Sequence, residues 1–249
     1  MHGANTGLMN RMKSWHIAVV VIAALLLVGA AGAAKPVREP VDKLVFVHYK
    51  DAPLKPSAGG DPAAAFKLMG VKWNSRNLPV SYTVYTANSY VPETSVATEV
   101  REAFSGWHAS TVPVLFSFGG STSTAPGDAS GNGKNEVYFA PIEEPNVIAD
   151  TTVWYYRFSK EIVEADIRMN AGMPWSVYEY GSGATYAGAD AYDIRNIATH
   201  EAGHVCGLAD LYTARSSELT MYGYGAMGEV KKDSIEAGDI AGLQKLYGA

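Results

Sequence analysis

Five residues in the last quarter of the sequence have the types and the spacing of a hydrolytic metal site. They form the pattern H-E-x-x-H-x-x-G-x-x-D and are His200, Glu201, His204, Gly207 and Asp210. Two histidines four residues apart on a helix leave the same face, so both imidazoles can bind one zinc ion. Gly207 can adopt the left-handed conformation that ends a helix, and the turn then returns Asp210 to the metal as a third ligand. Three protein ligands leave a fourth position open, which is typical of a catalytic zinc site.

The position of Glu201 beside the two histidines predicts a general base. It lies one step around the helix from His200, where it can reach a water molecule at the metal without being a ligand itself. The alternative is an exposed helix that carries two histidines and a glutamate by coincidence. The glycine and the aspartate at the matching offsets favour the metal site over that alternative.

Bulk composition indicates an ordinary globular protein. The chain has 249 residues, of which 47% are hydrophobic and 18% are charged, with a net charge of −5. This balance offers no basic patch, so a nucleic-acid partner is not expected. Cys206 is the only cysteine and excludes an intrachain disulfide. We interpret it as a small buried apolar residue, with a reactive or metal-binding thiol as the alternative.

The first 34 residues are typical of an export signal. Arg11 and Lys13 precede an uncharged apolar run over residues 17–34 that ends in small residues. This order predicts a signal peptide cleaved after Ala33 or Ala34. The run is about 18 residues long, so an uncleaved membrane anchor is the alternative. Both interpretations place the rest of the chain outside the membrane, and make the protein secreted or anchored at the cell surface.

Residues 35–70 are rich in proline, alanine and glycine, which predicts a linker or a short pro-segment. Residues 44–49 can form a short strand within it. The segment contains no cysteine, so it cannot offer a thiolate to a zinc site.

The folded domain is expected to span residues 71–249, with mixed strands and helices. Alternating or β-branched stretches predict strands over residues 78–85, 114–118, 135–142, 147–158 and 162–170. Apolar residues at helical spacing predict helices after Pro92, after Asp190 to Asp193, and over residues 234–247. The loop over residues 119–135 carries Asp128 and Asn132, for which a calcium site is conceivable although the spacing of a calcium-binding loop is absent.

The motif and the residues after it resemble the metzincin zinc proteases. Thr220-Met221-Tyr222-Gly223 matches the family's Met-turn, which forms an apolar floor beneath the metal, and residues 237–248 are similar to the last helix of the matrixin branch. The family's usual third ligand is histidine, whereas Asp210 corresponds to the aspartate of snapalysin-like members. The resemblance implies that Tyr222 lines a substrate pocket, with plain core packing as the alternative.

The resemblance also implies a fold and an activity. The fold is a twisted, mostly parallel five-stranded sheet with one antiparallel edge strand, at residues 147–158, and three helices. A peptide substrate would add to that edge as an antiparallel strand. The implied activity is that of an exported zinc endopeptidase with Glu201 as general base. We also considered a third ligand at Glu218 or Glu229, and a non-catalytic zinc-binding or adhesion module of the same fold, which would not need Glu201.

Overall fold

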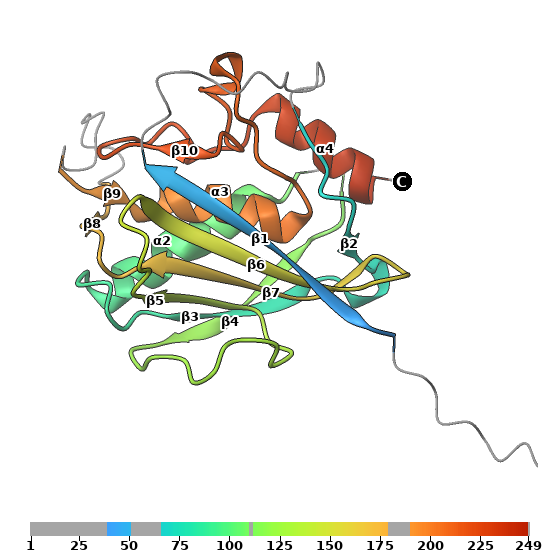
Figure 1. Ribbon diagram of the computed structural model, residues 1–249, viewed down its shortest axis with the longest axis horizontal. Helices are drawn as coiled ribbons and strands as arrows, with labels where there is room; N and C mark the ends of the chain where they lie inside the picture. Colours follow the sequence, from blue (N-terminus) through green and yellow to red (C-terminus); the bar gives the residue numbers. More distant parts are fainter. Residues whose placement is uncertain (1–38, 51–65, 110–111, 179–189, 249) are drawn as a thin grey trace, which may run out of the picture. The chain divides into compact units, whose positions relative to one another are not determined.

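A mixed β-sheet and three α-helices make up the described part of the chain. The computed structural model describes residues 39–50, 66–109, 112–178 and 190–248. The main sheet has the strand order β10-β1-β6-β7-β5-β3-β4, and β2 pairs with β7 (Figure 1). Its strands are β1 Val41–Lys50, β2 Lys72–Trp73, β3 Val80–Tyr85, β4 Phe116–Thr122, β5 Glu136–Ala140, β6 Val147–Tyr156, β7 Glu161–Asn170 and β10 Tyr224–Gly225. The short strands β8 Trp175–Ser176 and β9 Tyr192–Asp193 pair separately.

The predicted five-stranded sheet is confirmed within this larger one. Strands β4, β3, β5 and β7 are parallel to one another, and β6 is antiparallel to β7. The prediction that residues 147–158 form the edge of the sheet is wrong, because β1 pairs with the other side of β6. The helices are α2 Glu93–Gly106, α3 Ile194–Cys206 and α4 Ala237–Tyr247. The sheet and the helices together give the mostly parallel α/β fold that the sequence predicted.

Helix α2 packs between the sheet and α3, the helix that carries the H-E-x-x-H motif. On β3, Tyr82 stacks on Phe104 of α2 with ring centroids 3.9 Å apart. At the end of α2, the buried Trp107 donates a hydrogen bond of 2.9 Å from its indole nitrogen to the carbonyl of Thr199 on α3. A tryptophan at this position is therefore core packing that fixes the distance between the two helices.

Helix α3 is buried on nearly all sides, which fixes the groups it carries. It begins after Asp193, whose side chain accepts from the backbone N–H of Asn196, and it ends at Gly207 with a φ of 107°. Of its thirteen residues, Arg195 is the one that is not buried. Gly203 lies against Met221 and Trp107, where an added Cβ would approach within 2.2 and 2.7 Å. A helix held this closely cannot tilt without disrupting the core.

Strand β1 is longer than predicted and belongs to the sheet. The sequence indicated a short strand at residues 44–49 inside a linker, whereas Val41–Lys50 pairs antiparallel with β6 and parallel with β10. Its even-numbered residues face inward and its odd-numbered residues are more exposed. The flanking composition is that of a linker, so the full length of β1 could not be predicted from it. The extent of a strand depends on its partner strands as well as on its own sequence. The proposed domain boundary at residue 71 stays a prediction, and residues 51–65 lie outside the described ranges.

Two other element boundaries differ from the prediction. The strand expected at residues 114–118 is β4 at Phe116–Thr122, so it runs into the glycine-containing stretch that composition assigned to a loop. The last helix was expected from Ser234 but begins at Ala237. There Glu236 and Asp239 form a capping box that defines the first turn.

The loop for which calcium was considered uses its polar groups internally. The carboxylate of Asp128 accepts from the backbone of Ser130, and the amide of Asn132 donates to the carboxylate of Glu136 at 2.9 Å. Calcium binding at this loop stays a prediction. Within the described ranges, no helix is long and apolar enough to cross a membrane, and the apolar run at residues 17–34 lies outside those ranges.

A cluster of buried acids supports this loop. Glu136, Glu164 and Asp166 are each 3% exposed or less. The carboxylate of Glu164 accepts from the backbone N–H groups of Gly131 and Gly133, and Asp166 accepts from the backbone of Glu136. Burial, with the charge of Glu164 next in effect, raises the pKa of Asp166 to about 8.

We expect Asp166→Asn to stabilise the protein at pH 8. The folded protein retains a proton on Asp166 that the unfolded chain releases above its ordinary pKa of about 4, so stability falls as pH rises from about 4 to about 8. A neutral amide removes that loss, and each kcal/mol recovered raises Tm by about 2–4 °C. The Tm of wild type and of Asp166→Asn at pH 5 and pH 8 measures this effect. Asp128→Asn, on the exposed loop, is the control. An unchanged pH dependence in Asp166→Asn would contradict this account.

Candidate active site

Three side-chain atoms converge at the C-terminal half of α3. The Oδ1 atom of Asp210 lies 3.2 Å from Nε2 of His200 and 3.3 Å from Nε2 of His204. All three atoms are buried and have no hydrogen-bond partner among the described residues. Two imidazole nitrogens and a carboxylate oxygen form the donor set of a zinc site with an open position. A metal ion between them would satisfy three buried polar atoms at once.

The backbone brings these atoms together as the motif predicted. His200 and His204 lie on one face of α3, and Gly207 in the left-handed region then reverses the chain towards Asp210. An added Cβ at Gly207 would lie 2.9 Å from the carbonyl oxygen of Val71, so the turn also requires the close approach of another segment. Both the conformation and the contact favour glycine here.

Hydrogen bonds orient each candidate ligand. The Nδ1 atoms of His200 and His204 lie 2.8 Å from the carbonyl oxygens of Thr220 and Leu208. A carbonyl accepts only, so each Nδ1 carries a hydrogen, which leaves each Nε2 as the atom that can bind a metal. Such partners fix the tautomer and the ring orientation of metal-binding histidines.

The carboxylate of Asp210 is held in the same way. Its Oδ2 atom accepts from the hydroxyl of Tyr212 at 2.9 Å, which leaves Oδ1 facing the two histidines. Burial opposes ionisation of Asp210, but the neighbouring rings of His204 and His200 hold its pKa well below the usual range. Burial lowers the pKa of His200 to about 4. Burial opposes protonation of His204, but the carboxylates of Asp210 and Glu201 raise its pKa above the ordinary value. The site therefore presents an ionised carboxylate and a neutral His200, which can bind a metal directly, and a metal ion would displace any proton from Nε2 of His204.

Glu201 faces the same space from the adjacent position on α3. Its side chain is fully buried, and its Oε2 atom accepts a hydrogen bond from the hydroxyl of Thr151 on β6. Burial raises the pKa of Glu201 to about 7. A carboxylate with this pKa can both accept and donate a proton near neutral pH, as a general base must.

The residues assigned to the Met-turn pack against α3 and against the segment that follows Asp210. Met221 is 1% exposed, and its sulfur lies where a side chain on Gly203 would point. The backbone N–H of Leu211 donates to the carbonyl of Met221 at 2.8 Å, which joins the turn to the segment after Asp210. Tyr222 is 8% exposed, and its ring centroid is 5.4 Å from that of Tyr224.

The other candidates of the sequence analysis lie elsewhere. Glu218 is exposed and pairs with Lys231, and Glu229 pairs with Lys232, so neither joins the two histidines. Cys206 is fully buried, and burial raises the pKa of its thiol well above the ordinary value. It therefore behaves as a small core residue.

The sequence analysis missed several residues that complete the site. His48 is fully buried, with its Nδ1 atom 3.3 Å from Oε1 of Glu201. Thr151 donates a hydrogen bond to the other carboxylate oxygen, Tyr212 donates one to Asp210, and Nζ of Lys232 lies 3.1 Å from Nε2 of His48. A histidine in the apolar stretch 44–49 was a usable signal for His48. No local pattern marks the others, because each acts through a contact with a distant segment.

Strand β1 covers this centre. The ring of Phe46 stacks on His204, with centroids 4.3 Å apart and planes at 15°. The ring of His48 lies over His200, with centroids 4.0 Å apart. Burial and the neighbouring groups His200 and Lys232 hold the pKa of His48 well below its ordinary value, so the ring is neutral.

Comparison with known proteins agrees with this geometry. The family profile named Matrixin matches residues 72–248. The chain is also similar to a protein named Metalloendoproteinase 1-MMP from Arabidopsis thaliana, with 28% identity over 181 residues. That alignment covers 71% of this chain but 44% of the relative, so the chain spans less than half of the relative's length. The matched segment contains the sheet β3 to β7, the motif helix and the final helix, and we conclude that the chain belongs to the matrixin family.

Proposed function

We propose that this protein is a zinc-dependent endopeptidase. The observation that carries the proposal is the convergence of three buried, unpartnered atoms, one each from His200, His204 and Asp210, beside the buried carboxylate of Glu201. Membership of the matrixin family and the name of the plant relative support a metalloprotease. His200, His204 and Asp210 would hold the ion, and its preference for nitrogen and carboxylate ligands fits this set.

In this proposal each side chain has a distinct task. A bound zinc ion would supply Lewis acidity to the scissile carbonyl and would make water more acidic. Glu201 takes a proton from the attacking water and later delivers it to the amine that leaves. The hydroxyl of Thr151 fixes one carboxylate oxygen, so the other oxygen stays directed at the reacting centre. The carbonyls that bind His200 and His204 keep both rings in place throughout.

The substrate in this proposal is a protein or peptide that binds in extended form. Strand β6 is antiparallel to its inner neighbour and carries Thr151 at the catalytic carboxylate. Strand β1 pairs with the outer side of β6, so a peptide that pairs there takes the place of β1. Main-chain hydrogen bonds then hold the peptide, while pockets select its side chains. Tyr222 lies near the segment that faces β6 across the site, where it can line such a pocket.

We expect export with cleavage after Ala33 or Ala34. The basic start and the apolar run over residues 17–34 support this localisation, either secreted or, if the run is not removed, anchored to the membrane. Intact mass of the protein recovered outside the cell decides between the two. A mass that still includes residues 1–34 would contradict cleavage and leave the anchored form.

A zinc-binding or adhesion module of the same fold is the second candidate. The buried Glu201 argues against it, because an ionisable group with a raised pKa beside a metal site is costly unless the chemistry requires it. Two measurements on the full chain test the proposal: zinc content, and hydrolysis of an unstructured protein such as casein. One zinc per chain with hydrolysis that a chelator abolishes is expected. Zinc binding without hydrolysis in any variant with an accessible site would favour the module.

A further inference from the structure

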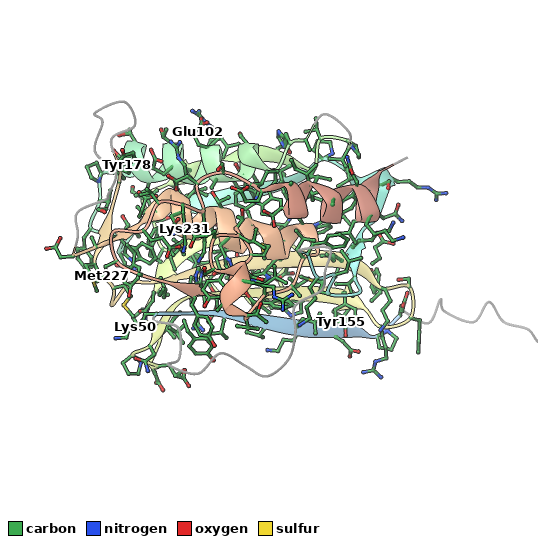
Figure 2. All side chains as sticks on the ribbon, turned by 90° about the horizontal axis from the view of Figure 1, so that it is seen from above. Lys50, Glu102, Tyr155, Tyr178, Met227 and Lys231 are labelled. Atoms are coloured by element: carbon green, nitrogen blue, oxygen red, sulfur yellow. The ribbon has the colours of Figure 1, made fainter. Side chains whose placement is uncertain are left out.

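Strand β1 lies where a bound peptide strand is expected. It pairs antiparallel with β6, from Val41 opposite Tyr156 to Tyr49 opposite Val147, and parallel with β10 on its other side. The backbone N–H of Tyr49 donates to Gly223 at 3.3 Å, and that of Lys50 donates to Asn146 at 2.9 Å. Figure 2 shows Lys50 and Tyr155 near opposite ends of this strand. We call the space between β6 and Gly223–Gly225 the peptide groove.

The rest of the sheet does not need β1. The family match begins at residue 72, after β1 has ended, and the matched segment contains the five adjacent strands β6, β7, β5, β3 and β4. Without β1, strand β6 would be an unpaired edge beside the active site. Strand β1 therefore has the position of an added ligand strand rather than of a framework strand.

The inward side chains of β1 occupy the reacting centre. Phe46 covers the ring of His204, and His48 covers His200 and approaches the carboxylate of Glu201. The second oxygen of that carboxylate is taken by Thr151. With β1 in place, neither oxygen of Glu201 faces an open space, so a second peptide cannot reach the base.

A distinct pocket receives the His48 side chain. An added Cβ on Gly225 would lie 3.0 Å from Nε2 of His48, and 3.2 and 3.5 Å from side-chain carbons of Ile148 and Ile197. The imidazole and the two isoleucines therefore surround the space that the missing side chain of Gly225 leaves free. We call this space, with Lys232 at its base, the His48 pocket.

Lys232 gives the His48 pocket a polar base. Its side chain is fully buried, and its Nζ atom donates to the carbonyl of Tyr224 at 2.6 Å and pairs with Glu229 at 3.3 Å. The same atom lies 3.1 Å from Nε2 of His48. The backbone of Lys232 donates to the side chain of Asn196 at 2.7 Å, which ties it to α3. An ammonium group has three hydrogens. The carbonyl of Tyr224 and the ion pair with Glu229 account for two of them, and Nε2 of His48 accepts the third.

We propose that Val41–Lys50 is an intramolecular ligand that blocks the peptide groove, and that Lys232 makes the His48 pocket select a side chain with a hydrogen-bond acceptor. The effect of β1 on hydrolysis rests on the proposed peptidase function, whereas the binding of β1 or of a peptide in the groove does not. Substrates with histidine or glutamine at this position satisfy the third ammonium hydrogen. An aliphatic side chain leaves it buried and unpaired, which is costly because the donor is charged.

Binding of a labelled peptide that copies residues 41–50 tests both parts. All full-length proteins carry Glu201→Gln, so the peptide is not cut and the same substitution is present in every protein compared. Wild-type β1 should exclude the peptide, whereas Phe46→Ala/His48→Ala should bind it at least tenfold more tightly by fluorescence anisotropy. Val45→Ala is the matched control, because this β1 side chain is 50% exposed and points away from the groove.

Peptides with glutamine or leucine in place of the histidine test the pocket. In Phe46→Ala/His48→Ala, the histidine and glutamine peptides should bind about tenfold or more tightly than the leucine peptide. Adding Lys232→Met should remove or reverse this preference. Equal binding of all three peptides overturns the role of Lys232. Because the comparison of peptides uses a protein with an unchanged Lys232, it can be made even if Lys232→Met fails to fold. Equal peptide binding by the wild-type and the substituted β1 overturns the blocking role.

Hydrolysis separates this inference from the proposed function. With Glu201 intact, Phe46→Ala/His48→Ala should cleave casein at least tenfold faster than the unsubstituted chain. If the substituted chain gains peptide binding but shows no hydrolysis, the inference stands and the peptidase proposal fails. If it shows hydrolysis at the wild-type rate without any gain in peptide binding, the peptidase proposal stands and the inference fails.

Discussion

Glu201→Gln is expected to abolish peptide hydrolysis while the protein keeps its zinc. The glutamine retains the size and the hydrogen-bonding oxygen of the side chain, so its contact with Thr151 survives. It cannot take a proton from water, and positioned general bases contribute roughly 10²–10⁴-fold to a rate. The rate of casein cleavage and the zinc content of the same preparation measure the two effects. The Phe46→Ala/His48→Ala chain is the more sensitive background, because its site is expected to be accessible.

The matched control for this prediction is Glu218→Gln, which changes the same group on an exposed side chain away from the site. It should leave both hydrolysis and zinc content unchanged. Hydrolysis by Glu201→Gln at the rate of the control would show that another group is the base. If Glu201→Gln loses both its zinc and its hydrolytic activity, Glu201 is a ligand rather than a base.

Local patterns in the sequence were sufficient for the framework of this protein. Strand β3 alternates with period two, and its inward residue Tyr82 packs on α2 as such a pattern implies. The offsets between His200, His204, Gly207 and Asp210 predicted a helix, a turn and a converging group, because these offsets are fixed by backbone geometry. The convergence of these three candidate ligands could therefore be derived without knowledge of any distant contact.

The parts that could not be predicted depend on pairing between distant segments. The composition around residues 41–50 indicates a linker with a short strand at residues 44–49, and pairing with β6 and β10 extends this stretch to a full strand of the sheet. Thr151 and Lys232 each reach the site from another segment, and neither lies in a motif. A polar side chain becomes part of a site through its partner, which a single sequence does not reveal.

Asp210→Ala is expected to lose most of the affinity for zinc. The substitution removes one of the three candidate ligand atoms, so only the Nε2 atoms of His200 and His204 remain to bind the zinc ion. The loss should exceed the roughly 10–100-fold that follows removal of an outer partner. Tyr212→Phe, which removes the hydrogen bond to Asp210 and no ligand, is the graded comparison. The dissociation constant for zinc, measured by competition with a chromophoric chelator, should increase from wild type to Tyr212→Phe and again to Asp210→Ala.

Asp210→His restores a ligand at the same position and should recover zinc binding that Asp210→Ala lacks, because imidazole nitrogen is an equally suitable zinc ligand. If Asp210→Ala instead binds zinc as tightly as wild type, the third ligand is another group. The structure then leaves His48, whose ligand atoms lie with those of His200 and Glu201 in a second possible metal-binding group. Repeating the titration with His48→Ala distinguishes the two sites, since His48 should matter only if Asp210 does not.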